Sequence, residues 1–149
     1  MKQAIYNIHF EPFNPDDLYI PPVRSTTQSA AVDIFNVTEE EIIVKRGSVV
    51  VVETNLKTII PPGYALFLTP RSGLAQNGLT IVNSPGIVDS DYRGEIKIIL
   101  TSFAQQVKIA PRARFAQAVG VHLIDGYTGT QTARGKLRGQ GGFGSTGDM

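Results

Sequence analysis

The stretch that decides the fold class is residues 49–68, VVVVETNLKTIIPPGYALFL. Residues 49–52 are a run of four valines, which suits a strand buried on both faces. A second apolar stretch, residues 56–60, ends at Pro61-Pro62-Gly63, a strong breaker of regular structure. Residues 64–68 then form a third apolar stretch of strand length. The pattern predicts successive short strands joined by tight turns.

The rest of the chain has the same organisation. Residues 95–98 alternate polar and apolar side chains, as in a half-buried strand, and residues 115–123 form a long apolar-rich strand candidate. Turn signals rich in Pro, Gly, Asn and Asp recur about every ten residues, which is typical of a β-barrel or β-sandwich. Only residues 72–77 offer a short helix. The sequence therefore predicts an all-β domain.

The composition excludes several classes of protein. The 149 residues include 14 Lys and Arg, 13 Asp and Glu, two His and no Cys. A formal charge of +1 gives no bulk reason to bind nucleic acid or a membrane, so neither is expected as a partner. The lack of Cys excludes disulfides, thiolate nucleophiles and zinc–cysteine sites. The sequence offers no targeting signal, so we expect a cytoplasmic protein by default.

The last 24 residues differ from the rest. Residues 126–149 hold eight of the 15 glycines and few apolar side chains, so they cannot form a core of their own. We therefore divide the chain into a β-barrel domain, residues 1–125, and a glycine-rich C-terminal arm, residues 126–149. The arm is either a disordered tail or a flexible segment that orders on a ligand or partner.

The densest polar cluster is DSDYRGE at residues 89–95, after the apolar residues 86–88. Read alone, it is the turn of a hairpin between two apolar strands. However, Tyr92 follows Asp89 by three residues at a tight bend, where both side chains can face one pocket.

Four further segments accompany this cluster: AAVDI at residues 30–34, PRSGLA at 70–75, RFAQAV at 114–119 and RGQGGFGSTG at 138–147. Together with residues 86–95, and in this order, they resemble the five motifs of the trimeric deoxyuridine triphosphatases (dUTPases). The third and fifth motifs are highly specific, whereas the fourth alone would carry no weight.

The resemblance implies a distorted antiparallel β-barrel of jelly-roll type with at most one short helix. It also implies a homotrimer with three active sites at the subunit interfaces, each receiving the C-terminal arm of a neighbour. The reaction it implies is hydrolysis of dUTP to dUMP and pyrophosphate by water attack on the α-phosphorus. That reaction keeps uracil out of DNA and supplies dUMP for thymidylate synthesis.

The third motif would carry the chemistry. Asp89 matches the aspartate that orients or deprotonates the water and bonds the deoxyribose 3′-OH. Tyr92 matches the residue packed under the deoxyribose, where its ring leaves no room for a 2′-hydroxyl. Asn83 matches a residue that hydrogen-bonds the uracil, although a turn Asn is a serious alternative.

Two other motifs would bind phosphate. Arg71, Ser72 and Gly73 match the second motif, and Ser72 alone also suits the N-cap of the short helix. Gln117 matches a residue that touches the α-phosphate region, and we interpret Arg114 on the same strand as structural.

The fifth motif would close the site. Five residues match the arm of the family: Arg138, Phe143, Gly144, Ser145 and Thr146. Phe143 would stack on the uracil, while Arg138, Ser145 and Thr146 would grip the β- and γ-phosphates. Closure of such an arm excludes bulk water from the reaction.

Magnesium is the cofactor that the triphosphate implies. We expect no direct protein ligand, because Mg²⁺ usually takes water and phosphate oxygens, and Asp33 is the best outer-shell carboxylate. The first motif departs from the common family pattern, with Ala31 and Val32 in place of Gly and an aromatic residue.

Two alternatives remain open. A dCTP deaminase shares the implied fold, but it carries a different third motif with a glutamate base, and Glu95 is the only glutamate near Asp89. The other alternative is a nucleotide-responsive binding protein whose main role is to contact a partner.

Overall fold

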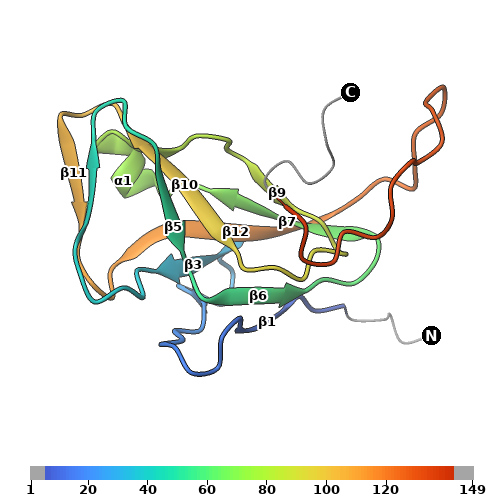
Figure 1. Ribbon diagram of the computed structural model, residues 1–149, viewed down its shortest axis with the longest axis horizontal. Coiled ribbons are helices and arrows are strands. Elements are labelled where there is room, and N and C mark those ends of the chain that lie inside the picture. Colours follow the sequence, from blue (N-terminus) through green and yellow to red (C-terminus); the bar gives the residue numbers. More distant parts are fainter. Residues whose placement is uncertain (1–5, 143–149) are drawn as a thin grey trace.

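The structure is a computed structural model that describes residues 6–142. Within this range the chain forms twelve short strands and one short helix, α1 (Ser72–Gln76) (Figure 1). The strands are β1 (His9–Pro12), β2 (Val23–Arg24), β3 (Ala31–Phe35), β4 (Ile42–Lys45), β5 (Val50–Glu53), β6 (Leu56–Ile59), β7 (Tyr64–Thr69), β8 (Leu79–Ile81), β9 (Gly86–Val88), β10 (Lys97–Ser102), β11 (Gln106–Ile109) and β12 (Arg114–His122). The all-β class with one short helix, predicted from the sequence, is confirmed.

The strands pair antiparallel in four small sheets. The largest has the order β2-β3-β12-β7-β9, and the next has the order β5-β10-β8. Two-stranded sheets β1-β6 and β11-β4 complete the set. The long strand β12 runs through the middle of the molecule, between β3 and β7 (Figure 1). Most pairs join segments far apart in the sequence, so this fold depends on non-local contacts.

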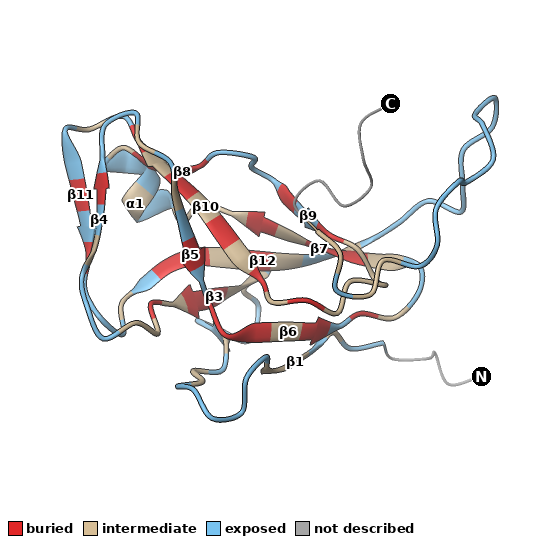
Figure 2. Ribbon diagram, viewed as in Figure 1, coloured by how far each residue is buried: buried red, intermediate tan, exposed pale blue. Residues whose placement is uncertain are grey.

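The core lies between these sheets. Burial alternates along strands such as β10, whose Ile98 and Leu100 are 1% and 0% exposed (Figure 2). Phe115 of β12 and Ile34 of β3 are equally buried. The predicted alternation at residues 95–98 is therefore correct, although β10 begins only at Lys97. In the described part of the chain, α1 is too short to cross a membrane.

The valine run at residues 49–52 is not buried on both faces, contrary to the prediction. Val49 and Val51 are 65% and 53% exposed, whereas Val52 is 4% exposed. Alternate side chains of β5 therefore face the core and the surface. Within the single chain, the outer side of Val51 has no cover, and a uniform run of valines cannot reveal this.

The hairpin predicted around residues 89–95 is also wrong. Strand β9 pairs with β7, and β10 pairs with β5 and β8. Residues 89–96 instead connect two different sheets. The polar cluster is thus a loop between sheets.

Strand register places three predicted motifs side by side. Gln117 of β12 lies opposite Asp33 of β3 on one side and opposite Thr69 of β7 on the other. Pro70 and Arg71 follow directly after Thr69. The first, second and fourth motifs therefore meet across one sheet, although they are separated in the sequence by tens of residues.

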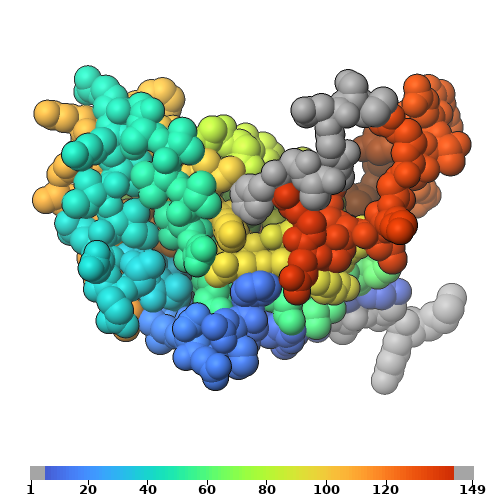
Figure 3. All heavy atoms as spheres, viewed as in Figure 1, coloured from blue at the N-terminus to red at the C-terminus, as the bar shows by residue number. Residues whose placement is uncertain are grey.

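The arm leaves the end of β12 as an extended connector. Every residue from 122 to 137 is exposed, and the chain then returns to the body of the molecule at Arg138. Figure 3 shows the red end of the arm lying against the yellow segment that includes the start of β10.

Candidate active site

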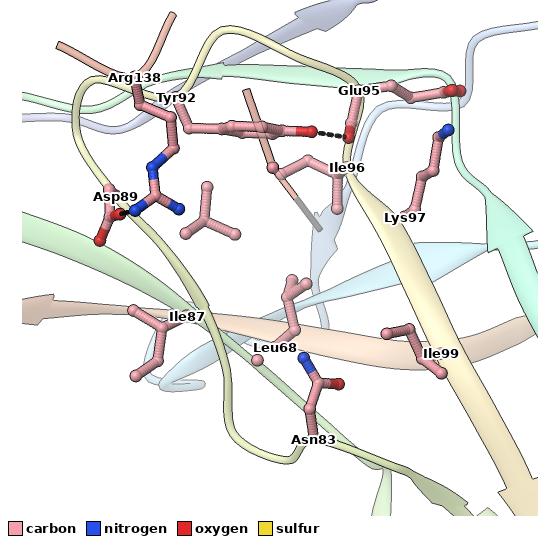
Figure 4. A pocket seen from close by; sticks show the side chains of 13 residues that line it. Leu68, Asn83, Ile87, Asp89, Tyr92, Glu95, Ile96, Lys97, Ile99 and Arg138 are labelled. Atoms are coloured by element: carbon pink, nitrogen blue, oxygen red, sulfur yellow. Dashed lines mark hydrogen bonds and ion pairs between the residues drawn. The ribbon is translucent and has the colours of Figure 1, made fainter. Parts of the chain in front are cut away.

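A cavity of about 290 Å³ opens beside β9 and the start of β10. Its lining combines apolar side chains with nearly as many polar ones (Figure 4). The lining residues are Leu68, Asn83, Gly86, Ile87, Val88, Asp89, Tyr92, Glu95, Ile96, Lys97, Ile99, Arg138 and Gly142. A cavity in which apolar walls and convergent polar groups occur together is a usual form of a small-molecule site.

Asp89 and Tyr92 both line this cavity, as the sequence predicted. Asp89 follows the last residue of β9, and the backbone N–H of Tyr92 donates to the Asp89 carbonyl at 3.1 Å. This bond closes a tight turn, which brings the two side chains to the same side. The Asp89 carboxylate is 41% exposed, so water can reach it.

The Tyr92 ring is held in place on several sides. Its hydroxyl donates to the Glu95 carbonyl at 2.7 Å. Gly94 makes room for the ring, because a Cβ at that position would lie 2.5 Å from the Tyr92 hydroxyl oxygen. Burial raises the pKa of Tyr92, and Glu95 adds to the shift, while Arg138 lowers it. The phenol therefore stays neutral and remains a hydrogen-bond donor at neutral pH.

Glu95 lies at a different part of the cavity wall from Asp89 (Figure 4). Its Oε2 accepts the backbone N–H of Asn55 at 2.9 Å. Burial raises the pKa of the Glu95 carboxyl, while the bond from Asn55 lowers it. One oxygen of Glu95 is therefore used to fasten the loop that contains Asn55.

Asn83 lies at the side of the cavity away from Asp89 (Figure 4). It follows β8 and precedes β9, in the loop between these strands. Its side chain is exposed and lines the cavity. The predicted base-binding position is thus beside the cavity, at a distance from the carboxylate.

Arg138 of the arm reaches the same cavity. Its Nη2 lies 3.0 Å from Asp89 Oδ2, and its backbone N–H donates to Asp91 Oδ2 at 2.7 Å. In the single chain, then, the described part of the arm lies on its own cavity. Asp91 was not among the residues predicted from the sequence, because only its place in the third motif distinguished it. Phe143, Gly144, Ser145 and Thr146 lie outside the described residues.

A second group of predicted residues gathers at β3, β12 and the end of β7. Asp33 is 5% exposed and pairs with two arginines: Oδ1 lies 3.1 Å from Arg71 Nε, and Oδ2 lies 3.2 Å from Arg114 Nη1. The Ser25 hydroxyl also donates to Asp33 Oδ2 at 3.0 Å. Arg114 therefore shares the Asp33 carboxylate with Arg71, and its structural role stays a prediction.

Gln117 belongs to this second group. Its Nε2 donates to the Pro70 carbonyl at 3.1 Å, which ties β12 to the segment before Arg71. Because Gln117 and Asp33 are register partners, the amide lies next to the arginine pair. We call Asp33, Arg71, Arg114 and Gln117 the arginine cluster.

Ser72 and Gly73 begin the short helix, but Ser72 is not its N-cap. Arg71 occupies the N-cap position, and within the described chain its side chain does not cap the helix by a hydrogen bond. The alternative of an N-cap serine is therefore wrong. Ser72 and Gly73 are both exposed.

The predicted site residues thus fall into two groups. We call Asn83, Asp89, Tyr92 and Arg138 the cavity cluster. Among residues 6–142, the lining of the cavity includes neither Arg71, Ser72 and Gly73 nor Gln117. One chain therefore presents two separate sets of groups, one around Asp89 and one around the pair Arg71 and Arg114.

The family of the chain follows from comparison with known proteins. The dUTPase family model matches residues 19–147. The chain belongs to the dUTPase family. The resemblance noted in the five motifs is therefore confirmed, and dUTP hydrolysis is the activity of that family.

Several relatives and solved structures are similar to the chain. The deoxyuridine 5′-triphosphate nucleotidohydrolase of Chlamydia pneumoniae is 40% identical over 130 residues, covering 85% of this chain and 90% of the relative. The protein of the same name from Rickettsia typhi is 37% identical over 129 residues, covering 85% and 87%. A dUTPase of Staphylococcus bacteriophage 80alpha, solved with dUpNHpp, has a TM-score of 0.72 at 21% identity, covering 95% and 99%. The last likeness concerns the fold alone.

The described residues do not offer a cage for magnesium. Across residues 6–142, no group of three or more His, Asp or Glu side chains converges. Asp33, the predicted outer-shell carboxylate, uses both oxygens on Arg71 and Arg114, and two guanidinium groups repel a nearby cation. The donor set therefore fits an anion better than a cation.

Proposed function

We propose that this dUTPase hydrolyses dUTP to dUMP and pyrophosphate in the cavity lined by Asp89 and Tyr92. Family membership carries the reaction, and the geometry supports the place. The decisive observation is that a water-accessible carboxylate and a fixed aromatic ring, three residues apart in the sequence, face one cavity. We assign Asp89 to the water that attacks the α-phosphorus, as base or as orienting acceptor.

Tyr92 is proposed to select the sugar. A ring that cannot shift excludes a 2′-hydroxyl by steric overlap, and the hydroxyl bond to Glu95 and the absence of a side chain at Gly94 restrict its movement. Asn83, on the side of the cavity away from Asp89, is proposed to contact the uracil. This order places the base and the reacting phosphate at separate parts of the cavity.

The arginine cluster is proposed to bind the phosphates. Arg71 is held through its Nε by Asp33, and its Nη1 donates to the Arg114 carbonyl at 3.5 Å, which leaves Nη2 to face an anion. Gln117 lies beside it, and Ser72 and Gly73 follow it. Pairing with a buried carboxylate pre-orients the arginine, so that less side-chain entropy is lost when the triphosphate binds.

The two clusters are proposed to meet across subunits of a homotrimer. The cavity cluster and the arginine cluster of one chain do not line a common cavity within residues 6–142. A neighbouring copy that supplies the arginine cluster would complete the site. Such sharing is feasible in a closed symmetric oligomer, where each interface is repeated.

The ion is proposed to enter with the substrate. Mg²⁺ prefers phosphate oxygens and water over a protein cage, and the arginine cluster does not suit it. We therefore assign no direct protein ligand to Mg²⁺. The role of Asp33 is to orient Arg71 and Arg114.

Release of pyrophosphate from dUTP, dTTP, dCTP and UTP in parallel, with Mg²⁺, tests this proposal. Hydrolysis of dUTP should exceed that of UTP by at least about 100-fold, because steric exclusion of one hydroxyl is added to base recognition. Ammonia from dCTP would be measured in the same reactions. Deamination of dCTP without pyrophosphate from dUTP would overturn the proposal in favour of the deaminase.

A further inference from the structure

Asp91 does not line the cavity, yet it contacts the C-terminal arm directly. Its Oδ2 accepts the backbone N–H of Arg138 at 2.7 Å. The main chains of the same segments also pair. The Arg93 N–H donates to the Gly139 carbonyl, as part of a parallel β-bridge between Tyr92 and Gly139. The arm is thus aligned with residues 91–93 chiefly through its backbone.

Arg138 is consequently held at two points. Asp91 holds its main chain, while Asp89 pairs with its guanidinium at 3.0 Å. The Gly141 N–H donates to the Arg138 carbonyl at 3.0 Å, and the turn between them needs Gly139, whose φ is +60°. The position of Arg138 therefore determines how the arm enters the cavity.

The path beyond Arg138 then crosses Tyr92. A Cβ at Gly142 would lie 3.1 Å from Tyr92 Cε2, so the arm passes close to the ring. A shift of Arg138 would move this crossing and the side chains that follow it.

In the described part of the arm, apolar burial contributes little along the connector. All residues from 122 to 137 are exposed, so they add little apolar burial to offset the entropy of ordering. A carboxylate that accepts a backbone N–H forms a charge-assisted bond, which is stronger than a neutral one and does not depend on the side chains of the arm.

We infer that Asp91 is a positioning residue that seats the C-terminal arm over the cavity. The inference rests on the proposed function, because it takes the arm to close over bound substrate. The bond from Asp91 is equally available to the arm of its own chain and to the arm of a neighbour.

The kinetic test compares Asp91→Ala with Asp91→Asn. The alanine variant should raise KM for dUTP about tenfold, with a smaller change in kcat, because saturating substrate still draws the arm into place. The asparagine variant keeps an acceptor oxygen and should stay closer to the unaltered protein. Asp125→Ala, which removes an exposed acid near the start of the arm, is the matched control and should leave both constants unchanged.

A second measurement does not depend on activity. Trypsin cleaves after Arg134, in the exposed connector, and after Arg138, whose backbone is bonded to Asp91. The initial rate of cleavage after Arg134 is the internal reference for the rate after Arg138. Asp91→Ala should raise the rate at Arg138 relative to Arg134 several-fold, because a seated backbone must open before cleavage. Thermal unfolding of each variant checks that the barrel is intact.

The outcomes separate the two proposals. Unchanged KM and an unchanged cleavage ratio in Asp91→Ala would overturn the role of Asp91. If the cleavage ratio rises in Asp91→Ala but the unaltered protein does not hydrolyse dUTP, the role of Asp91 is supported and the proposed function is overturned.

Discussion

Neighbouring groups restrict the position of the Tyr92 ring on several sides. The hydroxyl bond to the Glu95 carbonyl, the missing side chain at Gly94 and the close passage of Gly142 all act on one ring. Rotation of the ring would break its hydrogen bond to the Glu95 carbonyl or push the ring against the backbone at Gly94 or Gly142. A rigid ring can reject a slightly larger sugar, whereas a mobile ring would move aside.

Replacing Tyr92 with alanine should weaken sugar selection. The ratio of kcat/KM for UTP to that for dUTP should rise by roughly 10- to 100-fold, because the steric barrier to the 2′-hydroxyl is removed. Steady-state pyrophosphate release with both nucleotides measures this ratio. Tyr92→Phe keeps the ring and is the control, with only a small change expected. An unaltered ratio in the alanine variant would count against the role of Tyr92.

Glu95 should link stability to pH. Burial, and then nearby Glu53 and Asp17, raise its carboxyl pKa, while Asn55 and Lys97 lower it. Because the folded pKa lies above the unfolded one, the folded state binds this proton more tightly. The resulting stabilisation is present at acidic pH and is lost as the pH rises through the folded pKa.

Glu95→Gln should therefore be more stable relative to the unaltered protein at pH 7 than at acidic pH. The neutral amide avoids the cost of burying a charge and still offers an oxygen to the Asn55 N–H. Urea unfolding of both proteins at pH 7 and below the unfolded pKa, about 4.3, gives the two differences. A relative stability of the variant that increases on acidification would refute this assignment.

Among the elements, the arm should be separable from the barrel. It joins β12 through an exposed connector, and the core residues lie in the strands before it. Deleting residues 138–149 should lower kcat/KM for dUTP by about 100-fold or more if the arm closes over the cavity and excludes water as proposed. The unfolding temperature of the barrel should change little. Removing only residues 148–149, beyond the fifth motif, is the control; undiminished kcat/KM in the longer deletion would contradict the role of the arm.

The same connector bears on arm exchange, which remains a prediction. A stretch of 16 exposed residues, 122–137, can span up to about 50 Å when extended. The contacts at Asp89 and Asp91 can form with the arm of either chain, as in a domain swap.

Local signals predicted the elements better than their partners. Breakers such as Pro61-Pro62-Gly63 separate β6 from β7 as expected. The pairing of β9 with β7 was missed, because the third motif looks like a hairpin and its true partner lies elsewhere in the sequence. The exposure of Val51 was missed because four valines show no alternation.

The site was predictable to the same extent. Asp89 and Tyr92 share a cavity because a short turn places them together, and such a turn is readable from sequence. The pairing of Asp33 with Arg71 and Arg114 depends on the register of three strands, which no motif displays. Ser25 gave no signal, although it also binds Asp33.

On the scale of the whole molecule, one surface supports a shared site. Val51 is opposite Ile99 in the β5-β10 register, and the Val82 N–H donates to the Ile99 carbonyl. Val51 and Val82 are 53% and 50% exposed, and Ile99 lines the cavity. An apolar row beside the cavity is what a neighbouring subunit would cover if the site lies between chains.

The cavity cluster of one chain and the arginine cluster of another are proposed to form one site. Complementation between two variants tests it. Asp89→Asn and Arg71→Ala, each alone, should lose turnover by about 100-fold or more. Trimers that contain both variants should recover about a third of the unaltered activity, because one of their three sites receives both intact clusters.

The control and the readout make the measurement decisive. Arg71→Ala mixed with Gln117→Ala should not recover, because both changes lie in the same cluster of one chain. Two affinity tags select mixed trimers before pyrophosphate release from dUTP is measured. Recovery in the first mixture alone is the predicted result. Mixed trimers that stay as inactive as their parents would contradict the claim and place both clusters in a site within one chain.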